Sequence, residues 1–142
     1  MNADYRKLKV WHMSMELCHM IYDAIDNKKF PKDDTNMISQ IKRAAVSLPT
    51  NISEGASSKF EKNFLSYLNI AFCSLKELET LVKFCHERGY IDSGNFVAIS
   101  MQADKLGAKL YFLLQRVEER VKERDMMVYS LGRKKLKSNN SQ

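Results

Sequence analysis

The chain has 142 residues, 44% of them hydrophobic, and a formal net charge of +6 from 23 Lys and Arg against 17 Asp and Glu. This length suits one domain with a sizeable core, and 5 Gly and 2 Pro are too few turn formers for a fold of many short strands. The composition therefore predicts an all-α protein. Net positive charge fits an anionic partner such as nucleic acid, but it is also a common means of solubility.

The three cysteines, Cys18, Cys73 and Cys85, are scattered along a sequence with no secretory signal and no apolar run near the ~18 residues of a membrane span. An odd number at irregular spacing is typical of reduced thiols. We expect a cytoplasmic protein in which all three are small buried hydrophobic residues.

The first predicted helix covers about residues 10–27, where apolar residues recur at steps of three and four, the spacing of one buried helix face. This apolar stripe consists of Val10, Met13, Leu17, Met20 and Ala24. Trp11 broadens it and is expected to anchor one end of the core. Pro31 and its polar neighbours end this helix before Asp34 or Thr35 caps the next.

The second predicted helix covers about residues 35–54 and contains Pro49 without losing its spacing. Its stripe consists of Ile38, Ile41, Ala45, Leu48, Ile52 and Gly55. Because proline cannot donate to the carbonyl four residues earlier, we predict one helix with a kink near Ala45. Gly55 is expected to end it in a left-handed conformation.

The third and fourth predicted helices cover about residues 59–88 and 93–124. Ser58 and Glu61 have the spacing of a capping box, and Gly89 marks the C-terminal stop. Asp92 or Ser93 caps the last helix. The two stripes consist of Phe64, Leu68, Ala71, Leu75, Leu78, Val82 and Cys85, and of Phe96, Ile99, Ala103, Leu106, Leu110, Leu113, Val117 and Val121.

The three predicted connections are short, so consecutive helices must be antiparallel neighbours. We therefore predict an antiparallel up-and-down four-helix bundle over residues 1–125, followed by a basic tail, residues 126–142, that is disordered in isolation. Several large side chains, including Phe84 and Phe112, lie off the stripes. Their exposure on a monomer favours a homo-oligomer, although wider stripes would also bury them.

Three stretches carry a resemblance to a known family: Leu8-Lys9-Val10-Trp11, the segment from Gln40 to Gly55, and the segment from Ser74 to Thr80. Over roughly residues 5–122 the chain resembles the bacterial four-helix bundle proteins encoded in intervening sequences of large-subunit ribosomal RNA genes. The resemblance implies a ring-shaped homopentamer and no enzymatic activity. The related accessory proteins of diversity-generating retroelements bind nucleic acid and reverse transcriptase, which implies partners of that kind.

Catalytic and metal chemistry have little support in the sequence. Glu16 and His19 form one Glu-x-x-His, but a carboxylate-bridged di-metal bundle needs a second copy, and Lys9 and Lys83 stand three residues before His12 and His86. No glycine-rich phosphate loop or nucleophile motif occurs. We therefore expect no enzyme, no metal and no cofactor. Asn51 and Glu54 are a further catalytic candidate, but capping and inter-helix hydrogen bonds explain them more simply.

The strongest functional pattern is a basic ladder on the fourth helix. Its four cations fall within a stripe of about 60° when each residue advances about 100° around the axis, and an aromatic ring lies about 20° outside that stripe. The ladder consists of Lys105, Lys109, Arg116 and Arg120, with Phe112 beside it. Such a surface follows a phosphate backbone and stacks a base. Lys42 and Arg43, a basic pair of the family motif, are a second candidate.

Three functional hypotheses follow from these patterns, of which the least favoured is a metal-dependent enzyme built on Glu16 and His19. In the first, the protein is a non-enzymatic oligomer that binds RNA or a nucleoprotein partner through Lys105, Lys109, Phe112, Arg116 and Arg120, with Lys42 and Arg43 as a further site. In the second, it is a purely structural or protein-interaction oligomer whose basic residues pair with acids such as Glu77 or Glu79, or with a neighbouring subunit.

Overall fold

The structure is a computed structural model that describes residues 4–141. It contains a short 3-10 helix, η1 (Tyr5–Lys7), and four α-helices: α1 (Lys9–Ile25), α2 (Thr35–Ser57), α3 (Glu61–Glu87) and α4 (Ser93–Asn139). No strand occurs in residues 4–141, so the predicted all-α class is confirmed. No helix in this part of the chain is long and apolar enough to cross a membrane.

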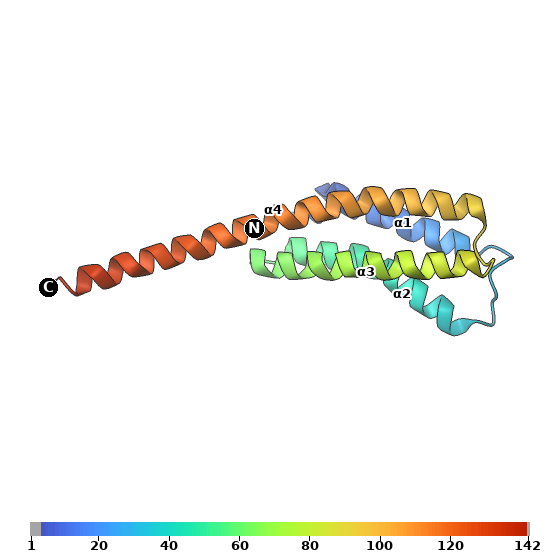
Figure 1. Ribbon diagram of the computed structural model, residues 1–142, viewed down its shortest axis with the longest axis horizontal. Coiled ribbons are helices and arrows are strands. Elements are labelled where there is room, and N and C mark those ends of the chain that lie inside the picture. The colour runs from blue at the N-terminus through green and yellow to red at the C-terminus, as the bar shows by residue number, and fades with distance from the viewer. Residues whose placement is uncertain (1–3, 142) are drawn as a thin grey trace.

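The four α-helices form an antiparallel bundle (Figure 1). Consecutive helices pack on one another and α1 also packs on α4, which leaves α2 and α4 at diagonal corners. The predicted stripes meet in the middle, where the fully buried side chains include Leu17, Ile41, Leu48, Ile52, Leu68, Leu75, Leu106 and Leu110. Burial of each such side chain contributes about 1.5 to 3 kcal/mol, which makes this shared core the main source of stability.

Helix α2 begins at the predicted position and runs through Pro49 as one helix, as the apolar spacing predicted. The Asp34 side chain caps it by accepting a hydrogen bond from the backbone N–H of Met37 at 3.1 Å. It ends at Ser57, three residues later than predicted. The kink that the sequence predicts near Ala45 stays a prediction.

Gly55 has a different role from the one predicted. It is buried within α2 and does not have positive φ, so it is not a left-handed terminator. A Cβ atom at this position would lie 2.7 Å from Cβ of Tyr67 and 3.0 Å from Cδ2 of Phe64. The glycine therefore allows α2 and α3 to approach closely near one end of the bundle.

The predicted capping box at the start of α3 does not form. Phe60 is the N-cap, and the Ser58 hydroxyl accepts a hydrogen bond from the backbone N–H of Phe60 at 3.3 Å. The Glu61 carboxylate instead accepts from Nε of Arg120 at 2.8 Å, because α4 packs beside this end of α3. The predicted stop of α3 is confirmed: Gly89 follows the helix with φ of +78°.

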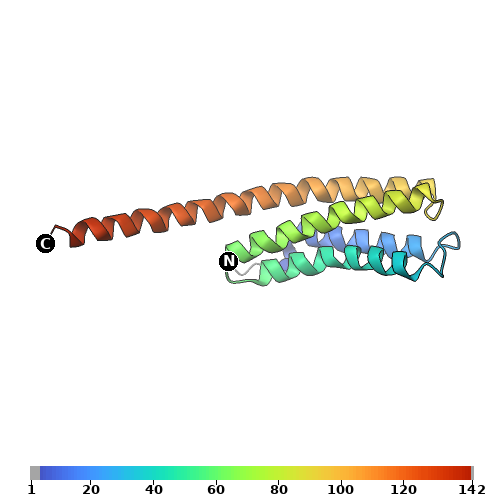
Figure 2. The ribbon, with the colours of Figure 1, turned by 60° about the horizontal axis from the view of Figure 1, so that its bottom comes forward.

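Helix α4 is much longer than the predicted residues 93–124. The Asp92 side chain caps it by accepting from the backbone N–H of Asn95 at 2.8 Å, and the helix continues to Asn139 through the segment expected to be disordered. This segment contains no proline and only one glycine, Gly132, so its local sequence permits a helix. It projects past the ends of the other helices (Figure 2), and every described residue from 122 onward is exposed.

Candidate nucleic-acid interface on helix α4

Part of the predicted basic ladder lies free on the surface of α4. Lys105, Lys109 and Arg116 are exposed, and within residues 4–141 none of the three has a carboxylate within 4 Å. Phe112 is 60% exposed, and the Arg116 guanidinium lies 5.8 Å from the centre of its ring. This arrangement presents three cations and one aromatic face to solvent along one helix.

Arg120, the last rung of the predicted ladder, is held by an ion pair. Its Nε donates to the Glu61 carboxylate at 2.8 Å, and the Glu61 side chain is only 7% exposed. This ion pair agrees, for Arg120, with the alternative hypothesis that the basic residues pair with acids within the protein. The partner is Glu61, however, and not the suggested Glu77 or Glu79. Glu79 pairs with Lys76 at 3.1 Å.

A hollow of about 390 Å³ lies where α1 begins beside α4. Its walls include Phe112 and Lys109 from α4 and Lys9, the first residue of α1. Lys9 is exposed. Lys9 is not part of the predicted ladder, because no local sequence pattern places residue 9 beside residues 109 and 112. The packing of α1 on α4 therefore places Lys9 at the same hollow as Lys109, one of the three exposed cations of the ladder.

The second predicted basic pair lies elsewhere. Nζ of Lys42 lies 4.8 Å from the centre of the Tyr22 ring, a cation–π contact between α2 and α1, and Arg43 is exposed. Helices α2 and α4 occupy diagonal corners of the bundle. The structure therefore does not join Lys42 and Arg43 to the ladder, and their role in binding stays a prediction.

Pro49 has a direct consequence for Cys18. In a helix, the N–H of residue 49 would bond to the carbonyl of Ala45, but proline has no N–H. The buried Cys18 thiol of α1 donates to that carbonyl across the interface, with Sγ 2.8 Å from the oxygen. Burial raises the pKa of the Cys18 thiol to about 11, so at neutral pH it keeps the proton that it donates.

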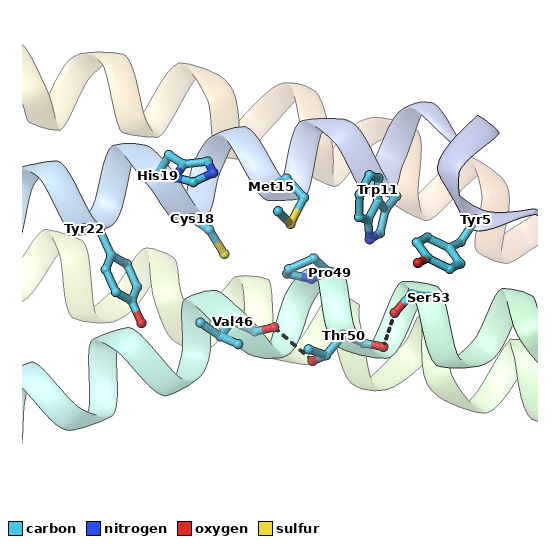
Figure 3. A pocket seen from close by; sticks show the side chains of 10 residues that line it. All are labelled: Tyr5, Trp11, Met15, Cys18, His19, Tyr22, Val46, Pro49, Thr50 and Ser53. Carbon is cyan, nitrogen blue, oxygen red and sulfur yellow. Dashed lines mark hydrogen bonds between the residues drawn. The ribbon is translucent and has the colours of Figure 1, made fainter.

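The groove above Pro49 is mainly apolar, with a volume of about 380 Å³ (Figure 3). Trp11, Met15 and Tyr22 line it from α1, and Val46, Pro49 and Thr50 line it from α2. The Thr50 hydroxyl donates back to the Val46 carbonyl at 2.9 Å, so it is already engaged within its own helix. This groove offers mostly apolar surface and little polar chemistry.

We expect Cys18→Ala to lower the free energy of unfolding by about 1 to 3 kcal/mol, because the buried Ala45 carbonyl loses its donor. Cys18→Ser keeps a donor and should cost less. In a Pro49→Ala background the new backbone N–H at position 49 reaches the carbonyl, so the cost of Cys18→Ala should shrink. Urea unfolding of the four chains of this double-mutant cycle measures the effect. Equal costs in both backgrounds would contradict it.

The other polar candidates do not converge. Glu16 accepts a hydrogen bond from Gln102 at 3.1 Å, His19 lines the apolar groove, and both are exposed. Within residues 4–141, no three His, Cys, Asp or Glu residues gather as a metal site would require. Burial, with the nearby charge of Asp34, raises the pKa of Cys85 to about 11. Cys73 is exposed, contrary to the prediction that all three thiols are buried.

These features define a helical bundle protein whose exposed chemistry is a line of cations beside an aromatic ring. A profile of the 23S rRNA-intervening sequence protein family matches residues 6–112. The chain therefore belongs to this family, as the sequence resemblance indicated. The match ends at Phe112, so the remainder of α4 lies beyond it.

Among solved structures, the chain is similar to a protein of unknown function from the S23 ribosomal protein family of Bacteroides thetaiotaomicron VPI-5482. The two share 22% sequence identity with a TM-score of 0.66, over 75% of this chain and 95% of the other. At this identity the likeness supports the fold alone. No curated protein sequence matches the chain.

Proposed function

We propose that this chain is a non-enzymatic, homo-oligomeric protein that binds single-stranded RNA along α4. The observation that carries the proposal is the set of three exposed cations, Lys105, Lys109 and Arg116, which have no ion-pair partner within residues 4–141, with Phe112 beside them. Cations at this spacing neutralise successive phosphates, and an exposed aromatic ring stacks on a base. The family's link to ribosomal RNA genes, carried in its name, supports RNA as the polyanion.

The hollow beside Phe112 gives this surface depth. A base stacked on Phe112 enters a space whose rim carries Lys9 and Lys109, so its flanking phosphates meet a cation from each of two helices. Arg120 is left out of this interface because Glu61 holds it. The proposed contact surface is thus Lys9, Lys105, Lys109, Phe112 and Arg116.

We expect the combined variant Lys105→Gln, Lys109→Gln, Arg116→Gln to weaken RNA binding about tenfold or more at low salt. Loss of three phosphate contacts should also reduce the slope of log K against log salt by about 2, at roughly 0.7 for each contact with a single strand. Fluorescence anisotropy of a labelled single-stranded RNA, titrated from low to high salt, measures both quantities.

The matched control removes three exposed lysines that are not part of the proposed contact surface: Lys28→Gln, Lys29→Gln, Lys83→Gln. It makes the same change in net charge, so it reports general electrostatic attraction. Phe112→Leu tests stacking separately, because it keeps an apolar side chain but removes the aromatic face. Equal weakening by the two triple variants, or no binding of RNA by the parent chain at low salt, would contradict the proposal.

A second candidate function is a structural or protein-interaction oligomer without an RNA role. The observation that favours it is the outer face of α4, where Val97 is 54%, Met101 55% and Phe112 60% exposed. Exposed apolar residues along one helix face support self-association, for which the family resemblance implies five subunits. Light scattering with absorbance at 260 and 280 nm separates the candidates: a multimer that carries no nucleic acid and binds none favours the second.

A further inference from the structure

The part of α4 that extends past the bundle, residues 122–139, is exposed along its whole length, and its contacts with the start of α3 are confined to its first two turns, where Lys62 pairs with Asp125 at 3.0 Å. It spans about 27 Å at 1.5 Å per residue and projects into solvent in Figures 1 and 2. A single helix of this length is marginally stable in water, and helices in proteins are stabilised mainly by packing of an apolar face. The extension carries such a face.

The apolar face of the extension continues the core-facing side of α4. At 100° per residue, most apolar side chains from residue 121 onward fall within about 160° of the helix, on the same side as the buried Leu110 and Val117, whereas Met126 and Met127 lie outside this sector. The face consists of Val121, Val128, Tyr129, Leu131 and Leu136. Within the bundle this side of α4 is covered by α1 and α3; beyond the bundle Val128 is 70% and Leu131 61% exposed.

Charge is distributed unevenly along this helix. Residues 118–125 carry four carboxylates and three cations, a net charge of −1, whereas the charged residues of 126–141 are four cations, Arg133, Lys134, Lys135 and Lys137. Two such helices side by side in parallel would place +4 against +4. In antiparallel orientation the basic end of each lies against the weakly acidic segment of the other, which favours that orientation.

A notch lies where the extension leaves the bundle. It has a volume of about 410 Å³, and its apolar lining comes from Phe60, Val121 and Val128. Phe60 is 65% exposed. In an antiparallel pair of extensions, the tip of one copy, which carries Leu136, reaches the notch of the second copy. Two-fold symmetry repeats the same contact between the tip of the second copy and the notch of the first.

We propose that the α4 extension is a self-association helix whose apolar face pairs antiparallel with the extension of a second copy of this chain. Each tip then fills the notch of the other copy. This contact is separate from the RNA surface, since Lys105, Lys109 and Arg116 precede the extension. The extension itself lies beyond the family match, which ends at Phe112.

The first test is solution mass by light scattering at equal protein concentration. Val128→Glu with Leu131→Glu places two charges in the apolar face; Met126→Glu with Ser130→Glu places the same two charges on the opposite side of the same exposed helix. We expect the parent and the control to have twice the mass of the first variant. This ratio of two is expected whether the bundles alone are monomers or rings. Equal masses in all three would overturn the proposal, as would an equal loss in both variants.

These residues lie outside the bundle core, so both variants should keep a cooperative thermal unfolding transition of the bundle, followed by circular dichroism. RNA anisotropy on the same chains separates this inference from the proposed function, because the ladder is intact in each. If the apolar-face variant keeps the parent's mass but loses RNA affinity, the extension is an RNA contact and the self-association proposal fails.

Disulfide cross-linking tests the orientation in a Cys73→Ser background, in which the remaining native thiols, Cys18 and Cys85, are buried. We expect a mixture of Val121→Cys and Ser138→Cys chains to form a link between the two variants. Ser138→Cys alone should form no link with itself. Self-linking of Ser138→Cys without the mixed link would mean parallel pairing and would overturn the antiparallel arrangement.

Discussion

Gly55→Ala is expected to lower the free energy of unfolding by about 2 kcal/mol. The added Cβ would lie 2.7 Å from Cβ of Tyr67, an atom fixed to the α3 backbone that cannot rotate away. Overpacking of this kind costs about 3 kcal/mol, and the better helix propensity of alanine offsets about 1 kcal/mol. Helices α2 and α3 must therefore separate near this point. Denaturant unfolding followed by circular dichroism measures the change.

Gly132→Ala is the matched control. Gly132 lies on the exposed extension, where an added Cβ would meet nothing within 4 Å. Only helix propensity changes there, so helical content should rise slightly and bundle stability should stay the same. If Gly55→Ala is as stable as the parent chain, the close approach of α2 and α3 does not require a glycine.

Arg120→Met is expected to lower the free energy of unfolding by about 2 to 3 kcal/mol. The substitution keeps most of the side-chain volume but leaves the Glu61 carboxylate, 7% exposed, without its cation. Removal of one partner from a buried pair costs about 3 to 5 kcal/mol, and we take a smaller value because the Arg120 side chain is 33% exposed. Thermal and denaturant unfolding measure the loss.

Two further variants show whether the buried carboxylate is the cause. Arg124→Met, one turn later on α4, removes an exposed cation and should cost little. Adding Glu61→Gln to Arg120→Met removes the unpaired charge and should restore part of the stability. If the double variant is no more stable than Arg120→Met, the lost free energy does not come from the isolated carboxylate.

The Arg120 ion pair also bears on binding. Because Glu61 holds the guanidinium, the proposed RNA surface ends near Arg116. The same pair fixes α4 against the start of α3, beside the notch from which the extension departs. Arg120→Met should therefore change stability much more than RNA affinity, which is the opposite of the pattern expected for Lys105 and Lys109.

The sequence by itself determined the architecture of the bundle. Apolar spacing of three and four residues gave the number of helices and their buried faces, and it correctly carried α2 through Pro49. Asp34, Asp92 and Gly89 act at helix ends as their residue types predicted. All of these signals act within about four residues along the chain, so they can be read locally.

The tertiary structure decided which distant residues meet. Glu61 pairs with Arg120 instead of capping its own helix, and Cys18 supplies the donor that Pro49 removes from Ala45. Lys9 joins Lys109 and Phe112 around one hollow only because α1 begins beside α4. The two hydrogen-bonded pairs are 27 and 59 residues apart in the sequence. Lys9 and Lys109 are even further apart. No local pattern encodes these contacts, because they depend on which helices are neighbours and on how the helices are offset along their axes.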